Sequence, residues 1–223
     1  MGAVPDASFE GWAVDEPTFL RVASEAIGAL EERGIPYAFI GGIASALHGR
    51  PRWTHDVDIF VRPEDAARTL EALAEVGFAT QRTDDFWLYK GIKEGVLVDV
   101  IFRSTGDIYL DDDMLGRSSV EEFKGLRLRV VSPEDLVVIK AVVHDEKTPR
   151  HWFDALAIIA RSELDWSYLV WRARQARHRV AALLLYALSN DLPVPKGAVH
   201  ALLDTVLEPS AERPHVIPRR EPA

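Results

Sequence analysis

The chain has no cysteine among its 223 residues. This absence excludes a disulfide framework, a thiolate metal site and redox chemistry through thiols. It is compatible with a reducing compartment, and we expect a cytoplasmic protein. The sequence also lacks a basic start followed by an apolar core, and it lacks a run of about 18 apolar residues, the length that crosses a bilayer. We therefore expect no membrane partner.

Positive charge is scarce as well, because 26 Lys and Arg residues stand against 35 Asp and Glu residues. With a formal net charge of -9, the surface as a whole should repel polyanions, so any contact with nucleic acid must be local. Hydrophobic residues make up 48% of the chain, which is enough for one sizeable core or two small ones. These properties predict a globular protein.

Hydrophobic periodicity divides the chain into a mixed part and a helical part. Helical spacing predicts a helix over residues 17–33, with Gly34 as its stop, and further helices over 43–50 and 63–78. Apolar runs and alternation predict strands over 37–42, 56–61, 86–92, 95–102 and 125–131. At 132–135, Ser-Pro-Glu-Asp combines an N-cap serine with a proline at the first helical position. From there to about residue 207 the pattern is helical, without a convincing strand.

The predicted fold class is therefore α/β (α+β), a mixed sheet flanked by helices followed by an all-helical domain. We expect the first domain to cover residues 17–131 and the helical domain residues 132–207. Residues 1–16 and 208–223 are rich in proline, glycine or acid and show no periodicity, so we expect loosely ordered tails there.

Two aspartates stand one residue apart in the apolar strand predicted over 56–61. Side chains at i and i+2 project from the same face of a strand, so Asp56 and Asp58 point together and repel. A divalent cation between them would relieve this repulsion, and ligand sets made only of oxygen suit Mg²⁺ or Mn²⁺. Asp99 lies in another apolar strand, which could pair alongside the first. Three acids on neighbouring strands would form a platform for two metal ions.

A glycine pair precedes the acids. Gly41 and Gly42 end one predicted strand and open a helix, where backbone N–H groups and the positive helix end can approach a phosphate. Taken alone, a glycine pair is ordinary turn chemistry, and an Asp-x-Asp pair is common on solvated strand ends. The conjunction of the glycines, the paired acids and Asp99 favours a phosphate and metal site over separate structural accidents.

These residues resemble the nucleotidyltransferases of the DNA polymerase beta superfamily, in which a strand, Gly-Gly or Gly-Ser, a short helix and an acid-x-acid pair follow one another. The sequence is similar to the minimal bacterial branch with the AbiEii-type toxin nucleotidyltransferases, well over residues 35–102 and more loosely over 132–160. The resemblance implies that Asp56 and Asp58 bind both metals, that Asp99 acts at the metal that activates the acceptor, and that Gly41 and Gly42 hold the triphosphate.

Four further residues enter the predicted nucleotide site. Arg52 and Thr54 precede the acids in an Arg-x-Thr-x-Asp-x-Asp arrangement similar to that of the family, and an arginine there could neutralise a departing pyrophosphate. Lys140 matches a family lysine that contacts the phosphates, and Asp154 matches the second acid of an Arg-Asp-x-x-Asp element. His151 departs from that element, since relatives carry an aspartate there. On pattern alone, Arg52 could equally be a solvated loop residue, and Lys140 could extend outward from an apolar face.

The resemblance implies an enzyme that moves a nucleoside monophosphate from an NTP to a hydroxyl acceptor, such as a tRNA, a protein or a small molecule, with Mg²⁺ or Mn²⁺ as cofactor. A cognate antitoxin is a candidate partner. Two alternatives stay open: a catalytically silent nucleotide-binding regulatory or antitoxin module of the same fold, and a metal-dependent phosphoester hydrolase, which the glycine pair disfavours.

Two charged runs have simpler interpretations. The acids at 111–113 are expected in a solvated loop, because no spaced acids complete a calcium loop. The four arginines in residues 171–180 do not share one helical stripe, so we expect a solvated face with internal ion pairs there rather than an RNA-binding helix.

Overall fold

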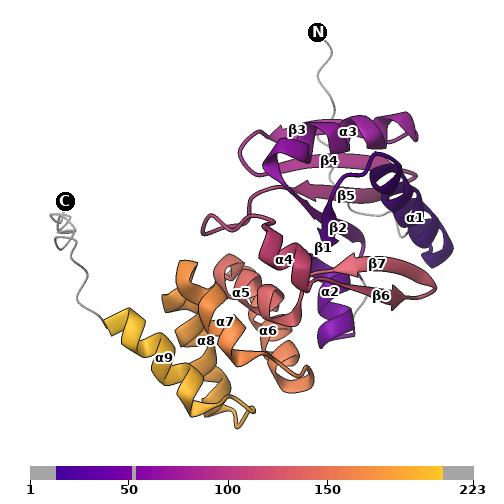
Figure 1. The fold of residues 1–223 in the computed structure, drawn as a ribbon. Coiled ribbons are helices and arrows are strands. Elements are labelled where there is room, and N and C mark those ends of the chain that lie inside the picture. The colour runs from indigo at the N-terminus through magenta and orange to yellow at the C-terminus, as the bar shows by residue number, and fades with distance from the viewer. Residues whose placement is uncertain (1–13, 52–53, 208–223) are drawn as a thin grey trace, which may run out of the picture.

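The structure of the protein is a computed structural model, and it describes residues 14–51 and 54–207 (Figure 1). The strands are β1 Tyr37–Phe39, β2 Asp56–Val61, β3 Ala79–Asp84, β4 Leu88–Lys93, β5 Val96–Ile101, β6 Ser119–Phe123 and β7 Leu126–Val130. The α-helices are α1 Glu16–Glu32, α2 Gly41–His48, α3 Ala66–Glu75, α4 Asp112–Arg117, α5 Pro133–Val143, α6 Arg150–Arg161, α7 Trp166–Arg172, α8 Arg177–Ser189 and α9 Lys196–Leu207. Two short 3₁₀ turns, Pro63–Asp65 and Ala173–Gln175, precede α3 and α8.

The strands form one sheet in the order β3-β4-β5-β2-β1-β7-β6. β2 pairs in parallel with β5, and β1 pairs in parallel with β7, whereas the other neighbours are antiparallel. The predicted fold class, a mixed sheet flanked by helices and followed by helices, is confirmed. The strand predicted over residues 56–61 has those bounds in the structure.

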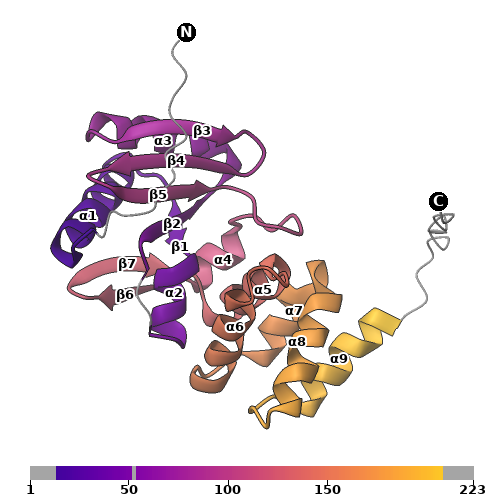
Figure 2. The same cartoon turned by 180° about the vertical axis from the view of Figure 1, so that it is seen from behind.

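Helices α1 and α3 cover one face of the sheet (Figures 1 and 2). The burial of strand β5 explains which face these helices cover. Val96, Val98 and Val100 are fully buried on that face, whereas the residues between them are only half-buried. Gly91, the register partner of Val98, lies against α3: a Cβ there would come within 3.2 Å of the Leu73 side chain. The alternation of β5 therefore leaves its other face, which carries Asp99, partly open.

The second half of the described chain is helical, as predicted, and its first helix begins at the predicted cap. The Ser132 hydroxyl accepts a hydrogen bond from the backbone N–H of Asp135, and Pro133 occupies the first turn. Buried apolar side chains form one cluster that runs from Phe19 in α1 to Leu202 in α9. Whether residues 17–131 and 132–207 are separate domains stays a prediction.

Three elements were absent from the sequence prediction. Strands β3 and β6 lie at the two edges of the sheet, where their side chains are mostly exposed, so they lack the alternation that marks a strand with one buried face. The third is α4, and it corrects the solvated loop expected at 111–113. Asp111 caps this helix by accepting a hydrogen bond from the Met114 N–H at 2.8 Å, and Asp112 and Asp113 form its first turn.

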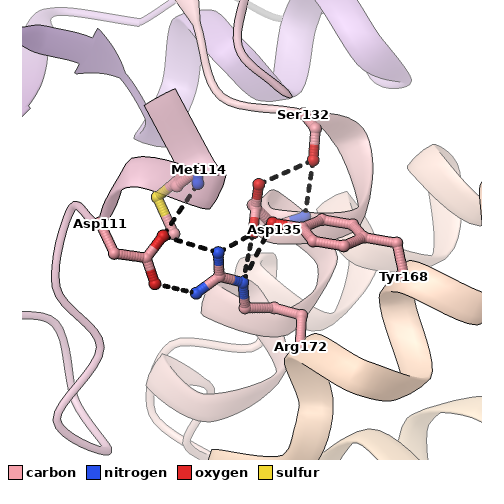
Figure 3. Close-up of polar contacts among 6 residues, drawn as sticks. All are labelled: Asp111, Met114, Ser132, Asp135, Tyr168 and Arg172. Atoms are coloured by element: carbon pink, nitrogen blue, oxygen red, sulfur yellow. Dashed lines mark hydrogen bonds and ion pairs between the residues drawn. The ribbon is translucent and has the colours of Figure 1, made fainter. Parts of the chain in front are cut away.

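One arginine of the run at 171–180 differs from the expectation of a solvated face, whereas Arg174 and Arg179 are exposed as expected. Arg172 is only 2% exposed, and its guanidinium lies between two carboxylates (Figure 3). It donates to Asp111 at 2.6 and 2.9 Å and pairs with Asp135 at 2.7 Å. Asp135 also accepts from the Tyr168 hydroxyl at 2.9 Å. This network ties the segment before α4 to α5 and α7, so Arg172 joins the sheet half to the helical half.

Candidate active site

The three acids predicted to act together do converge. Asp56 and Asp58 project from β2, and the register pairs Asp58 directly with Asp99 on the parallel neighbour β5. Each acid offers a carboxylate oxygen such that the three atoms lie within 4.8 Å of one another, and all three side chains are half-buried. Among the described residues, this is the cluster of His, Asp and Glu side chains with metal-binding spacing.

Two hydrogen bonds orient the carboxylates of β2. The buried Thr54 hydroxyl donates to Asp56 Oδ1 at 2.5 Å. The Gly42 N–H, in the first turn of α2, donates to Asp58 Oδ2 at 3.2 Å. Because these partners lie in the segments that surround β2, local chain geometry fixes the direction in which both acids point.

The glycine pair leaves no room for side chains at its place in the fold. Gly41 has φ +63°, and a Cβ there would lie 1.8 Å from Oδ2 of Asp58. At Gly42 a Cβ would lie 2.3 Å from the hydroxyl oxygen of Thr54. The two glycines therefore allow the turn before α2 to pack directly against the acid cluster. This contact places the predicted phosphate-binding turn beside the predicted metal ligands.

One cation contacts the cluster from the sheet. Lys90 on β4 is the register partner of Asp99, and its Nζ lies 2.8 Å from Asp99 Oδ1. Lys90 was not among the site residues predicted from the sequence. The sequence alternation of β4 shows which residues share a face with Lys90, but it identifies Asp99 as the neighbour only when the pairing register of β4 and β5 is known.

The electrostatics of the cluster are those of crowded acids. Burial, together with the charges of Asp56 and Asp99, raises the pKa of the Asp58 carboxyl to about 6. The Gly42 N–H and Lys140 act in the opposite direction on the same pKa. Burial also raises the pKa of Asp99, although Lys90 partly offsets that effect. The site thus holds more negative charge than the protein itself neutralises.

The predicted nucleotide-binding residues of the helical half are buried and lie together. Lys140 on α5 donates to Asp154 Oδ2 on α6 at 3.2 Å, and these residues are 2% and 0% exposed. Arg50, which follows α2, reaches Asp154 Oδ1 at 3.4 Å. The predicted Arg52 lies outside the described residues. A role of Lys140, Asp154 and Arg52 in nucleotide binding stays a prediction.

His151, which occupies the place where the resembling family carries an aspartate, is half-buried at the start of α6. Its Nδ1 is buried without a hydrogen-bond partner among the described residues. Burial, together with the positive charges of Lys140 and Arg150, lowers the pKa of this imidazole to about 4. Histidine at this position is therefore neutral at pH 7.

The residues present fit a divalent metal ion. Three carboxylates from adjacent strands supply an all-oxygen ligand set, which suits Mg²⁺ or Mn²⁺. Burial and the neighbouring charges of Asp56 and Asp99 disfavour the charged form of Asp58, and a divalent cation would offset both effects.

Among the helices of residues 14–51 and 54–207, none has the length and apolar character of a membrane span.

The family model described as an uncharacterised nucleotidyltransferase matches residues 8–193 of the chain. No curated protein is similar enough to count as a match.

Three solved structures are similar to this chain at low identity. The antibiotic-resistance factor ANT(2'')-Ia is 17% identical, with a TM-score of 0.52 over 77% of this chain and 98% of its own. A nucleotidyltransferase-like protein of Paracoccidioides brasiliensis is 18% identical, with a TM-score of 0.49 over 82% of this chain and 91% of its own. A Thermotoga maritima protein described as a nucleotidyltransferase is 22% identical, with a TM-score of 0.42 over 53% of this chain and 80% of its own.

Proposed function

Because this chain belongs to the nucleotidyltransferase family whose model spans residues 8–193, we propose that it transfers a nucleoside monophosphate from an NTP to a hydroxyl acceptor in a reaction that depends on divalent metal. The observation that carries this proposal is the convergence of Asp56, Asp58 and Asp99 to within 4.8 Å beside the glycine turn. A structural role would not explain three half-buried acids that repel one another at a point where the backbone makes room for them.

Each residue of the site has a part in this reaction. Asp56 and Asp58, which Thr54 and the Gly42 N–H orient, would hold the metal ions, and Asp99 would complete the site on the acceptor side. When bound, Mg²⁺ or Mn²⁺ supplies Lewis-acid stabilisation of the phosphoryl oxygens during an in-line displacement. The turn at Gly41 and Gly42 would bring backbone N–H groups to the triphosphate, and Arg52 and Lys140 would neutralise its charge.

The products follow from the bonds exchanged. The acceptor hydroxyl loses its proton to solvent, and its oxygen bonds to the α-phosphorus to form a phosphodiester. The bond from that phosphorus to the oxygen that bridges to the β-phosphate breaks, and pyrophosphate leaves. The acceptor is a tRNA, a protein or a small molecule in this proposal. Membership of the AbiEii-type toxin branch, with a cognate antitoxin as partner, is the finer form of the proposal and rests on the sequence resemblance alone.

The test is transfer of label. The protein is incubated with each α-³²P NTP, Mg²⁺ and either total RNA or cell extract, and the products are separated by size. The wild type is expected to label an acceptor, whereas Asp56→Asn/Asp58→Asn is expected to lose at least about 1,000-fold of the rate because both metal ligands are gone. A matched control is Asp84→Asn/Asp85→Asn, which removes two acids that lie outside the cluster, at the end of β3 and in the turn that follows it.

Three outcomes would contradict the proposal. Equal labelling by the Asp56→Asn/Asp58→Asn variant would refute the catalytic assignment. Binding of NTP without transfer to any acceptor would favour a catalytically silent regulatory module. Release of inorganic phosphate from a phosphoester without nucleotide would indicate a hydrolase instead.

A further inference from the structure

The acid cluster has a built-in counter-ion that no part of the proposed reaction requires. Lys90 reaches the cluster from β4, with its Nζ 2.8 Å from Asp99 Oδ1. The cross-strand register aligns Gln81, Lys90, Asp99 and Asp58 in one row across four adjacent strands of the sheet. Lys90 and Asp99 are 26% and 16% exposed, so the pair is shielded from water more than an ordinary surface ion pair.

Lys90 and a metal ion would compete for the same carboxylate. A lysine ammonium is a compact point charge, and at 2.8 Å it occupies the oxygen that it contacts. Asp56 and Asp58 have hydrogen-bond donors in Thr54 and Gly42, but those donors are neutral. Among the described residues, Asp99 is therefore the acid of the cluster whose hydrogen-bond partner carries a full positive charge.

We propose that Lys90 is a positioning residue that holds Asp99 in place and opposes metal binding on the Asp99 side until a nucleotide brings further negative charge. This inference rests on the proposed metal-dependent function. In the absence of nucleotide, Asp56 and Asp58 form the stronger part of the site, and the part completed by Asp99 is weak. Binding of the triphosphate then shifts the balance of charge toward the second metal ion, so the site is fully loaded only when substrate is present.

The same strand offers a matched control. Lys93 is three residues further along β4 and so points to the opposite face, where its Nζ lies 2.5 Å from Glu25 on α1. Both lysines are partly buried, and both pair with one carboxylate. Substitution of either lysine removes an ion pair of similar exposure, but only Lys90 contacts the acid cluster.

The experiment measures Mn²⁺ binding without nucleotide, by the loss of the electron paramagnetic resonance signal of free Mn²⁺, in the full chain. Lys90→Met is expected to bind Mn²⁺ at least about tenfold more tightly than the wild type, because removal of one positive charge beside the site strengthens the attraction for a divalent cation. Lys90→Arg and Lys93→Met are expected to bind like the wild type. Thermal melts should show a larger gain in Tm on addition of Mn²⁺ for Lys90→Met than for Lys93→Met.

The outcomes separate this inference from the proposed function. If Lys90→Met has a lower Tm but the Mn²⁺ affinity of the wild type, Lys90 is a structural ion pair and the inference is overturned. If Asp56→Asn/Asp58→Asn binds Mn²⁺ as the wild type does, the metal site itself is wrong and both proposals fail. If Lys90→Met does not fold, Lys90→Gln takes its place in the same titration and is held to the same result.

Discussion

Replacing Asp58 by asparagine should stabilise the metal-free protein at neutral pH while it removes metal binding. The pKa of Asp58 is raised from 3.8 to about 6, so the folded chain binds a proton that the unfolded chain has already released. Stability therefore falls as the pH rises from about 4 to about 6, and the full cost persists above that range. Asparagine keeps an oxygen that can accept from the Gly42 N–H, but it carries no charge.

The size of the effect follows from the pKa. One pKa unit corresponds to about 1.4 kcal/mol, so the rise at Asp58 represents at most about 3 kcal/mol at pH 7.5. The charges of Asp56 and Asp99 contribute to this rise, and the Asp58 side chain retains some contact with solvent. We therefore expect Asp58→Asn to gain about 1–2 kcal/mol in the free energy of unfolding. For a protein of this length, that is a rise in Tm of about 2–8 °C.

The assay is urea denaturation in the presence of EDTA at pH 4 and pH 7.5, with the exposed Asp204→Asn on α9 as a control that should match the wild type. The gain of Asp58→Asn should be near zero at pH 4 and full at pH 7.5. Addition of Mg²⁺ at pH 7.5 should stabilise the wild type by mass action and leave Asp58→Asn unchanged. A gain of equal size at both pH values, or no gain at all, would refute the electrostatic argument.

Three further predictions concern single positions. Gly41→Ala should lower the free energy of unfolding by at least about 2 kcal/mol, because φ is +63° there and the new Cβ would collide with the Asp58 carboxylate. Urea denaturation measures this loss, and an unchanged free energy of unfolding would contradict the close packing of the turn. Arg172→Met should cost about 3–5 kcal/mol in the same assay, since it leaves the buried Asp135 and the half-buried Asp111 without their cation. The exposed Arg174→Met should cost under about 0.5 kcal/mol, and similar losses for the two variants would argue against the network of Figure 3. His151→Asn should lose less stability than the wild type between pH 7 and pH 5. Because the folded pKa of His151 is about 4, its contribution to stability is present above pH 6.5 and is lost as the pH falls toward 4; parallel pH profiles of the free energy of unfolding for the two proteins would contradict this prediction.

Sequence patterns identified the parts of this protein that local chemistry controls. In the strand with Asp56 and Asp58, the two acids alternate with Val57 and Ile59, so the shared direction of the acids could be predicted from the period of a strand. Ser132 and Pro133 marked the start of α5 because capping depends on neighbours only a few residues away. The glycine turn was predictable for the same reason. The close packing of Gly41 against Asp58 and of Gly42 against Thr54, which leaves no room for a Cβ, was visible only in the structure.

Tertiary structure decided what depends on partners distant in the chain. The register between β4 and β5 placed Lys90 on Asp99, and the same alternation in sequence would fit a register in which that lysine faces elsewhere. The edge strands β3 and β6 form although most of their side chains stay in water, because backbone pairing with a neighbour holds them. Arg172 looked like a surface residue in an arginine-rich run, yet it is buried because Asp111 and Asp135, 61 and 37 positions earlier in the chain, meet around it. Local chemistry fixes helix starts, strand faces and turns, whereas charge pairing and register depend on which segments the fold brings side by side.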